Sequence, residues 1–158
     1  MWLLVAVLIG FIAFVLYRND KISIKPFISI PVFAFYLSFV ATITIIARIP
    51  SHNAQYRLML FWSYRAIAGG KTDLISEVFW NFVLFIPIGI LLMLIISCKH
   101  KWIISIAIGL LLSASIEIIQ LKFHRGLFEF DDIFHNTLGT VIGIGMFLFI
   151  SAARKKIR

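Results

Sequence analysis

Three carboxylates fall within four consecutive residues of the segment HRGLFEFDDIFHNTLGT, which covers residues 124–140. They belong to Glu129, Asp131 and Asp132, and the same segment carries Arg125 and two histidines. Paired carboxylates can exchange protons as general acid and base, and an arginine can hold a phosphate or carboxylate through two hydrogen bonds. Because strongly apolar runs flank the segment on both sides, these groups are candidates for chemistry at a membrane surface.

Polar side chains also stand near the ends of the neighbouring apolar runs. Glu117 and Gln120 are three residues apart, and Asn136 follows Asp132 by four, so each pair shares one helix face. Membrane-embedded ionisable residues are functional candidates by default. The plainer alternative is that each polar group only marks the end of its own helix. We expect instead that they converge on one ligand-binding pocket, made of Asn81, Glu117, Gln120, Arg125, Asp131, Asp132 and Asn136.

The composition identifies the elements that must position these groups. Of the 158 residues, 61% are hydrophobic, whereas a soluble domain is typically about half apolar. The chain is therefore predicted to be an all-α, polytopic integral membrane helical bundle that forms a single domain over residues 1–158. Five runs approach the about 20 residues that cross a bilayer. We predict transmembrane helices over residues 1–17, 27–47, 79–97, 102–121 and 133–153.

The charges predict which way these helices point. One set of connections (18–25, 98–101 and 154–158) holds nine basic residues against the single acid Asp20, whereas the other set (48–80 and 117–132) holds six basic residues and six acids. Basic excess marks the cytoplasmic side. The first run is not preceded by a basic residue, as a signal peptide would be. We therefore expect a multi-pass cell-membrane protein with its N-terminus outside and its C-terminus in the cytoplasm, and no role in nucleic-acid binding.

The long connection over residues 50–80 is expected to lie at the outer surface. Its core, QYRLMLFWSYRAI, mixes aromatic side chains with Arg57 and Arg65 before Gly69 and Gly70 interrupt it. This pattern is typical of an amphipathic helix or re-entrant segment in the headgroup layer. Such a segment would serve as a simple anchor, or would form a roof over the pocket.

Proline, glycine and aspartate positions predict further details of how the helices bend, pack and begin. Pro87, with Gly89 two residues later, is expected to kink the third span. The kink would open a cleft, or Pro87 is an ordinary proline of a membrane helix. Gly139 and Gly143 form a G-x-x-x-G pattern, which allows close helix packing, either within the chain or in a homo-oligomer. Asp131 and Asp132 also suit a helix N-terminus, where at least one of the two would cap free N–H groups.

Three motifs resemble those of the VanZ-like family. They are NFVLFIPIGILL from Asn81, SASIEIIQ from Ser113, and RGLFEFDDIFHNTLGTVIG from Arg125, in that order. The resemblance covers about Arg57 to Gly143, inside a core of about 57–153. The family pattern falls on Asn81, Pro87, Gly89, Glu117, Gln120, Arg125, Asp131, Asp132, Asn136 and Gly139. The resemblance implies a small bacterial envelope protein associated with low-level resistance to lipoglycopeptides such as teicoplanin, and it brings no settled reaction.

Three functions remain open at this point. The pocket could bind a lipidated or lipid-linked ligand, such as a lipoglycopeptide or a cell-wall precursor, among the membrane lipids. It could be an enzyme site, with Glu117 as general acid or base and Asp131 or Asp132 as its partner, acting on an envelope lipid or polyprenyl-linked precursor. The polar residues could also form a structural lock between helices, with Arg125 folding back to Glu117.

No cofactor is expected from the sequence. Glu117, His124, Asp131, Asp132 and His135 have ligand-type side chains, but their spacing matches no established metal motif, so we expect no metal. The sequence contains no G-x-S-x-G elbow, P-loop, dinucleotide fingerprint or H-E-x-x-H. Cys98 is the single cysteine, which rules out an intrachain disulfide.

Overall fold

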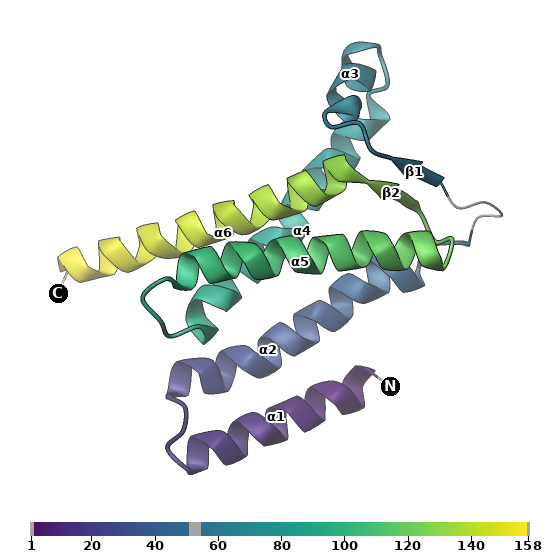
Figure 1. The fold of residues 1–158 in the computed structure, drawn as a ribbon. Coiled ribbons are helices and arrows are strands. Elements are labelled where there is room, and N and C mark those ends of the chain that lie inside the picture. Colours follow the sequence, from purple (N-terminus) through teal and green to yellow (C-terminus); the bar gives the residue numbers. More distant parts are fainter. Residues whose placement is uncertain (1, 51–54, 158) are drawn as a thin grey trace.

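Long apolar helices make up most of the protein (Figure 1). The computed structural model describes residues 2–50 and 55–157, so Met1 of the first predicted span and Arg158 of the basic C-terminus lie outside it. The helices are α1 (Trp2–Arg18), α2 (Ile24–Ala41), η1 (Thr42–Ile46), α3 (Trp62–Ala68), α4 (Asp73–Ile95), α5 (Lys101–Lys122) and α6 (Phe130–Ile157). The all-α prediction is confirmed, apart from two short strands, β1 (Gln55–Arg57) and β2 (Leu127–Glu129).

Four candidate membrane spans occur among the described residues, and all four correspond to predicted ones. They are 24–46 (α2 with η1), α4, α5 and α6. The protein is thus a multi-pass membrane protein. The predicted first span is a shorter apolar helix, α1, whose 17 residues cover about 26 Å against a hydrocarbon core of about 30 Å.

The boundaries of α4 differ most from the prediction. This helix begins at Asp73, six residues before the predicted start, because the polar turn TDLIS is itself helical. Pro87 lies inside the continuous helix, where it removes the N–H that would bond to the carbonyl of Val83. The next carbonyl, that of Leu84, accepts a hydrogen bond from the Tyr36 hydroxyl of α2 at 2.8 Å, which ties α2 to α4.

Helices α4 and α6 form the tightest pair of the bundle, and glycines explain why. A Cβ on Gly139 would collide with the carbonyl oxygen of Phe82, and one on Gly143 would collide with that of Ile86. Gly89 of α4 meets the carbonyl of Thr140 in the same way. The G-x-x-x-G stripe of α6 therefore packs against α4 of the same chain. Of the two uses that the sequence allowed for this face, packing within the chain or in a homo-oligomer, the structure has the first.

The connections are sorted to two ends of the bundle, as Figure 1 shows. The α1–α2 and α4–α5 connections and the end of α6 lie at one end. The start of α1, the end of η1, α3, the strands and the α5–α6 connection lie at the other. The first set carries the predicted basic excess, so the charge of the chain is segregated along the bundle axis.

The segment predicted to be amphipathic folds in pieces. Residues 51–54 lie outside the described part. β1 then pairs in parallel with β2, with Arg57 opposite Glu129. Between β1 and α4, where every residue is described, the helical part is the seven-residue α3. A single interfacial helix over this segment is therefore wrong, because pairing with β2 draws residues 55–57 into extended backbone.

Candidate functional site

Buried polar side chains gather where α5 ends and α6 begins. We call this group the polar corner, and it consists of Ser113, Glu117, Gln120, Glu129, Asp132 and Asn136, none more than 7% exposed. Helix α5 supplies three of the six, β2 supplies Glu129, and α6 supplies the remaining two. The predicted spacing explains the arrangement, since residues three or four apart face the same neighbour.

Hydrogen bonds join the elements of the corner. Glu117 accepts the backbone N–H of Glu129 through Oε2 at 2.9 Å, which fixes β2 against α5. Asn136 donates from Nδ2 to the hydroxyl of Ser113 at 2.9 Å, which joins α6 to α5. Gln120 donates from Nε2 to the carbonyl of Thr44 at 3.1 Å, which brings η1 to the same place.

Five buried side-chain atoms remain without a hydrogen-bond partner among the described residues. Two are Nε1 of Trp62 and Nδ1 of His135. The other three are Oε1 of Gln120 and Oδ1 of Asn136, in the polar corner, and Nδ2 of Asn81. Leaving a buried polar group unpaired costs about 1–3 kcal/mol. A site with two free acceptors and one free donor can therefore gain by binding a group that supplies the missing partners.

The corner is rich in negative charge. Glu77 of α4, although exposed, lies close enough to repel Glu117, Glu129 and Asp132. Arg48, directly after η1, attracts the same three carboxylates. A Cβ on Gly126 would lie 2.6 Å from Nη1 of Arg48, so the glycine leaves room for this guanidinium.

Glu129 lies outside the spanning helices and titrates abnormally. Burial raises the pKa of its carboxyl to about 7, and repulsion from Glu77 adds to the rise. Arg57, its partner across the strand pair, opposes the shift. A carboxyl group that titrates near neutral pH can donate or accept a proton under physiological conditions.

Asp131 directs its hydrogen bonds to the start of α3 instead of to the polar corner. Its carboxylate accepts the N–H of Ser63 at 2.9 Å, the hydroxyl of Ser63 at 2.6 Å, and the N–H of Phe61. An aspartate commonly caps the helix that follows it. Here it caps a helix about 70 residues earlier in the chain, so the predicted capping role is found but on a different helix.

His135 continues the contact with α3. Its Nε2 lies 2.9 Å from the hydroxyl of Tyr64, and the ring is fully buried. Burial raises the pKa of Tyr64, and the charge of Asp131 adds to the rise, so the phenol keeps its proton at neutral pH. Asp131 and His135 therefore hold α3 against the start of α6.

The predicted fold-back of Arg125 to Glu117 is wrong. Its Nη1 donates to the carbonyls of Ile46 at 2.7 Å, and of Ile45 and Arg48 at 3.2 Å each. These carbonyls lie at the end of η1, where backbone acceptors lack helical partners. The guanidinium of Arg125 satisfies these carbonyls. Arg48, and not Arg125, attracts the three carboxylates of the corner.

The structure thus divides the predicted site residues into two groups. It brings together Glu117, Gln120, Asp132 and Asn136, with Asn81 on the adjacent helix, and it gives Arg125 and Asp131 structural partners. The predicted ligand-binding set did not include Arg48, Ser113, Glu129 or His135. Glu129 was signalled only as one of the three carboxylates clustered at residues 129–132.

Within residues 2–50 and 55–157, no three His, Cys, Asp or Glu side chains are arranged to hold a metal ion. The chemistry that this arrangement supports is hydrogen bonding and proton exchange by carboxyl and amide groups in a low-dielectric environment.

One comparison with known proteins gives a match. A family model described as VanZ/LLP1 matches residues 2–151, which is nearly the whole chain. No curated protein and no solved structure matches.

Proposed function

Because the chain belongs to the VanZ/LLP1 family, we propose that the polar corner binds the head of a lipidated or lipid-linked envelope ligand. The observation that carries this proposal is the set of unpaired buried atoms on Asn81, Gln120 and Asn136, beside a cluster of carboxylates. If these residues served only to hold the helices together, the bundle would be more stable with these atoms paired in hydrogen bonds. Ligand sites combine apolar walls with a few oriented polar groups, and the corner fits this description.

We propose that the corner faces outward, in a five-span topology with α1 as the first span. The support is the segregation of charge, since the end opposite the corner carries the basic excess. Single cysteines in a Cys98→Ser background test this orientation. A membrane-impermeant thiol reagent should label Lys122→Cys in intact cells but Lys155→Cys only after permeabilisation. The reverse pattern would place the corner in the cytoplasm.

We further propose that ligand binding underlies low-level tolerance of teicoplanin. The test is expression in a sensitive bacterium, with growth scored against teicoplanin and against vancomycin, which lacks the acyl tail. Tolerance of teicoplanin alone is expected. Equal tolerance of both drugs, or of neither, would contradict a role that depends on the tail.

Glu117→Gln separates binding from catalysis. The amide keeps an acceptor for the N–H of Glu129 but loses the charge. Removing a charged hydrogen-bonding partner costs about 1.5–3 kcal/mol, so a binder should weaken by roughly 10- to 150-fold. An enzyme that uses Glu117 as general acid or base should instead lose nearly all turnover. Lys122→Gln, at an exposed position five residues later, is the matched control.

The second candidate is this enzyme, and burial of Glu117, Glu129 and Asp132 in one place favours it. Neighbouring carboxyl groups in a dry site divide the roles of acid and base between them. The substrate class would be an envelope lipid or polyprenyl-linked precursor. For Arg125 and Asp131 we propose the structural role, because their contacts to η1 and α3 already use them.

A further inference from the structure

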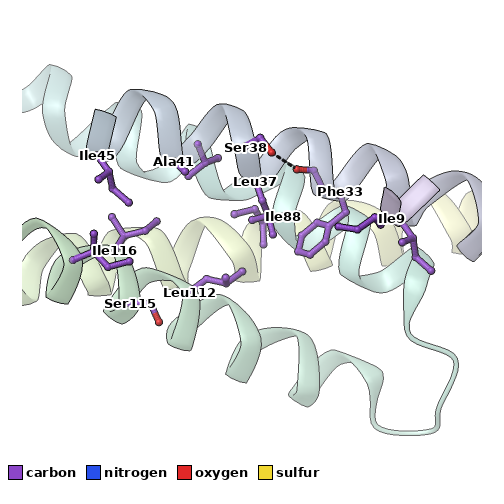
Figure 2. Close-up of a pocket in the computed structure, with 14 residues that line it drawn as sticks. Ile9, Phe33, Leu37, Ser38, Ala41, Ile45, Ile88, Leu112, Ser115 and Ile116 are labelled. Atoms are coloured by element: carbon purple, nitrogen blue, oxygen red, sulfur yellow. Dashed lines mark hydrogen bonds between the residues drawn. The ribbon is translucent and has the colours of Figure 1, made fainter. Parts of the chain in front are cut away.

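An apolar groove runs beside the polar corner, between α2 and α5 (Figure 2). Its volume is about 510 Å³. In Figure 2 the side chains of Ile45 and Ile116 face each other across it. Val40 and Ile88 line the groove and are 1% and 0% exposed, so it reaches the core of the bundle.

Small side chains on α2 keep the groove open. Ala34, Ser38 and Ala41 line it at intervals of four and three residues, which places them on one face. Such a stripe usually lets a neighbouring helix pack closely. Here α2 and α5 both pack on α4, and the space between them is left unfilled.

Nothing polar in the groove is left unpaired. Its two hydroxyls belong to Ser38 and Ser115, which donate to the carbonyls of Ala34 at 2.9 Å and Leu111 at 2.7 Å in their own helices. An apolar space of this kind does not hold water. Its lining side chains lose dispersion contacts unless other apolar atoms fill it.

The dimensions fit one hydrocarbon chain. The lining residues of α2 and η1 extend from Ile30 to Ile45, or about 22 Å at 1.5 Å per residue. A space of about 510 Å³ spread over that length is long and narrow. It also covers most of the hydrocarbon thickness of about 30 Å.

The groove ends at the corner. Ile116 and Ile119 line it and stand next to Glu117 and Gln120 on α5. On the opposite wall, the carbonyl of Ile45 accepts a bond from Arg125. A chain lying in the groove would therefore place the group attached to its end against the polar side chains.

We infer that this groove holds the hydrocarbon chain of the ligand whose head the polar corner binds, an inference that rests on the proposed function. The chain would enter from the lipid between α2 and α5 and lie along Ala34, Ala41 and Leu112. Because the chain comes from lipid and not from water, its gain is the dispersion contact with the side chains that line the groove. The protein would therefore bind a head group that carries a hydrocarbon chain more tightly than the same head group without one.

Photolabelling tests occupancy without any drug. The probe is a phosphatidylglycerol with a diazirine at mid-chain, present in vesicles that contain the full protein. We expect labels on the lining residues of α5, which are Leu112, Ser115, Ile116 and Ile119, and on those of α2 and η1 between residues 34 and 45. In the wild type, equal labelling of exposed positions that do not line the groove, such as Leu110 and Leu111, would overturn the inference.

Filling the groove supplies the second measurement. Ala34→Phe and Ala41→Phe should each reduce groove labelling several-fold, while Ala107→Phe, at an exposed position on α5, leaves it unchanged. Size-exclusion profiles in detergent check that each variant folds. Equal labelling in all three would contradict the inference, and loss of the folded peak leaves the wild-type label map to decide.

These experiments distinguish a failure of the groove inference from a failure of the proposed function. If Ala41→Phe abolishes labelling but neither it nor Glu117→Gln changes teicoplanin tolerance, the groove holds a chain and the proposed function is wrong. If Glu117→Gln lowers tolerance while Ala41→Phe alters neither tolerance nor labelling, the function stands and the groove inference fails.

Discussion

The carboxylate of Asp131, in the first turn of α6, caps the start of α3 by accepting both the N–H and the hydroxyl of Ser63. The two residues are 68 positions apart. This contact fixes α3 against the helix bundle, and it defines the first prediction.

Asp131→Asn should destabilise the protein. The NH2 group of asparagine cannot accept a hydrogen bond, so the variant loses the charge and one of the two acceptor oxygens, and hydrogen bonds to charged groups contribute about 1.5–3 kcal/mol. The measurement is thermal unfolding in detergent, followed by circular dichroism. Asp20→Asn is the control, because Asp20 is exposed and its φ of 55° suits asparagine. An equal midpoint for both variants would argue against the cap.

Arg125→Gln should loosen the end of η1. The substitution removes the cation that serves three backbone carbonyls, and we expect a loss of about 1–3 kcal/mol in unfolding free energy. Hydrogen exchange should rise in residues 42–48 more than elsewhere. Lys122→Gln, which removes an exposed charge nearby, should leave exchange there unchanged.

Gly143→Ala should weaken the α4–α6 pair. The new Cβ would collide with the carbonyl oxygen of Ile86, and overpacking of this kind costs about 1–3 kcal/mol. Gly145→Ala on the same helix is the matched control, since a Cβ there meets nothing within 4 Å. The comparison uses midpoints of thermal unfolding. If both alanine variants unfold at the same temperature, α4 and α6 do not pack through this glycine.

Stability should fall as pH rises from about 5 through about 7, in part because of Glu129. Its pKa is about 7 in the folded protein, against 4.5 for the free side chain. Between these values the folded state holds the proton and the unfolded state does not, so rising pH favours unfolding. The contribution is complete below pH 4.5 and lost above 7.

Glu129→Gln should flatten this pH profile, because the amide does not titrate. Unfolding midpoints at several pH values between 5 and 8 provide the measurement. The titratable and charged groups around Glu129 are Glu77, Glu117, Asp131, Asp132, Arg48 and Arg57, so part of the slope should survive. Identical slopes in wild type and variant would mean that Glu129 titrates normally.

Sequence alone determined the membrane class, four of the spans and the sorting of charge to the two ends. These features depend on hydropathy over about 20 residues and on charge in short connections, both of which are local properties. Helical spacing also placed Glu117 with Gln120, and Asp132 with Asn136, on shared faces. The motifs from Asn81, Ser113 and Arg125 were enough to indicate the family, which the match over residues 2–151 confirms.

Only the tertiary structure decided the partner of each polar side chain. Arg125 and Arg48 both lie near the end of η1, yet one binds carbonyls and the other faces the acids. That choice depends on the approach of segments about 80 residues apart, which local patterns do not encode. The groove between α2 and α5 is likewise a property of how two helices diverge over α4, because the same small residues would serve equally well in a closed interface.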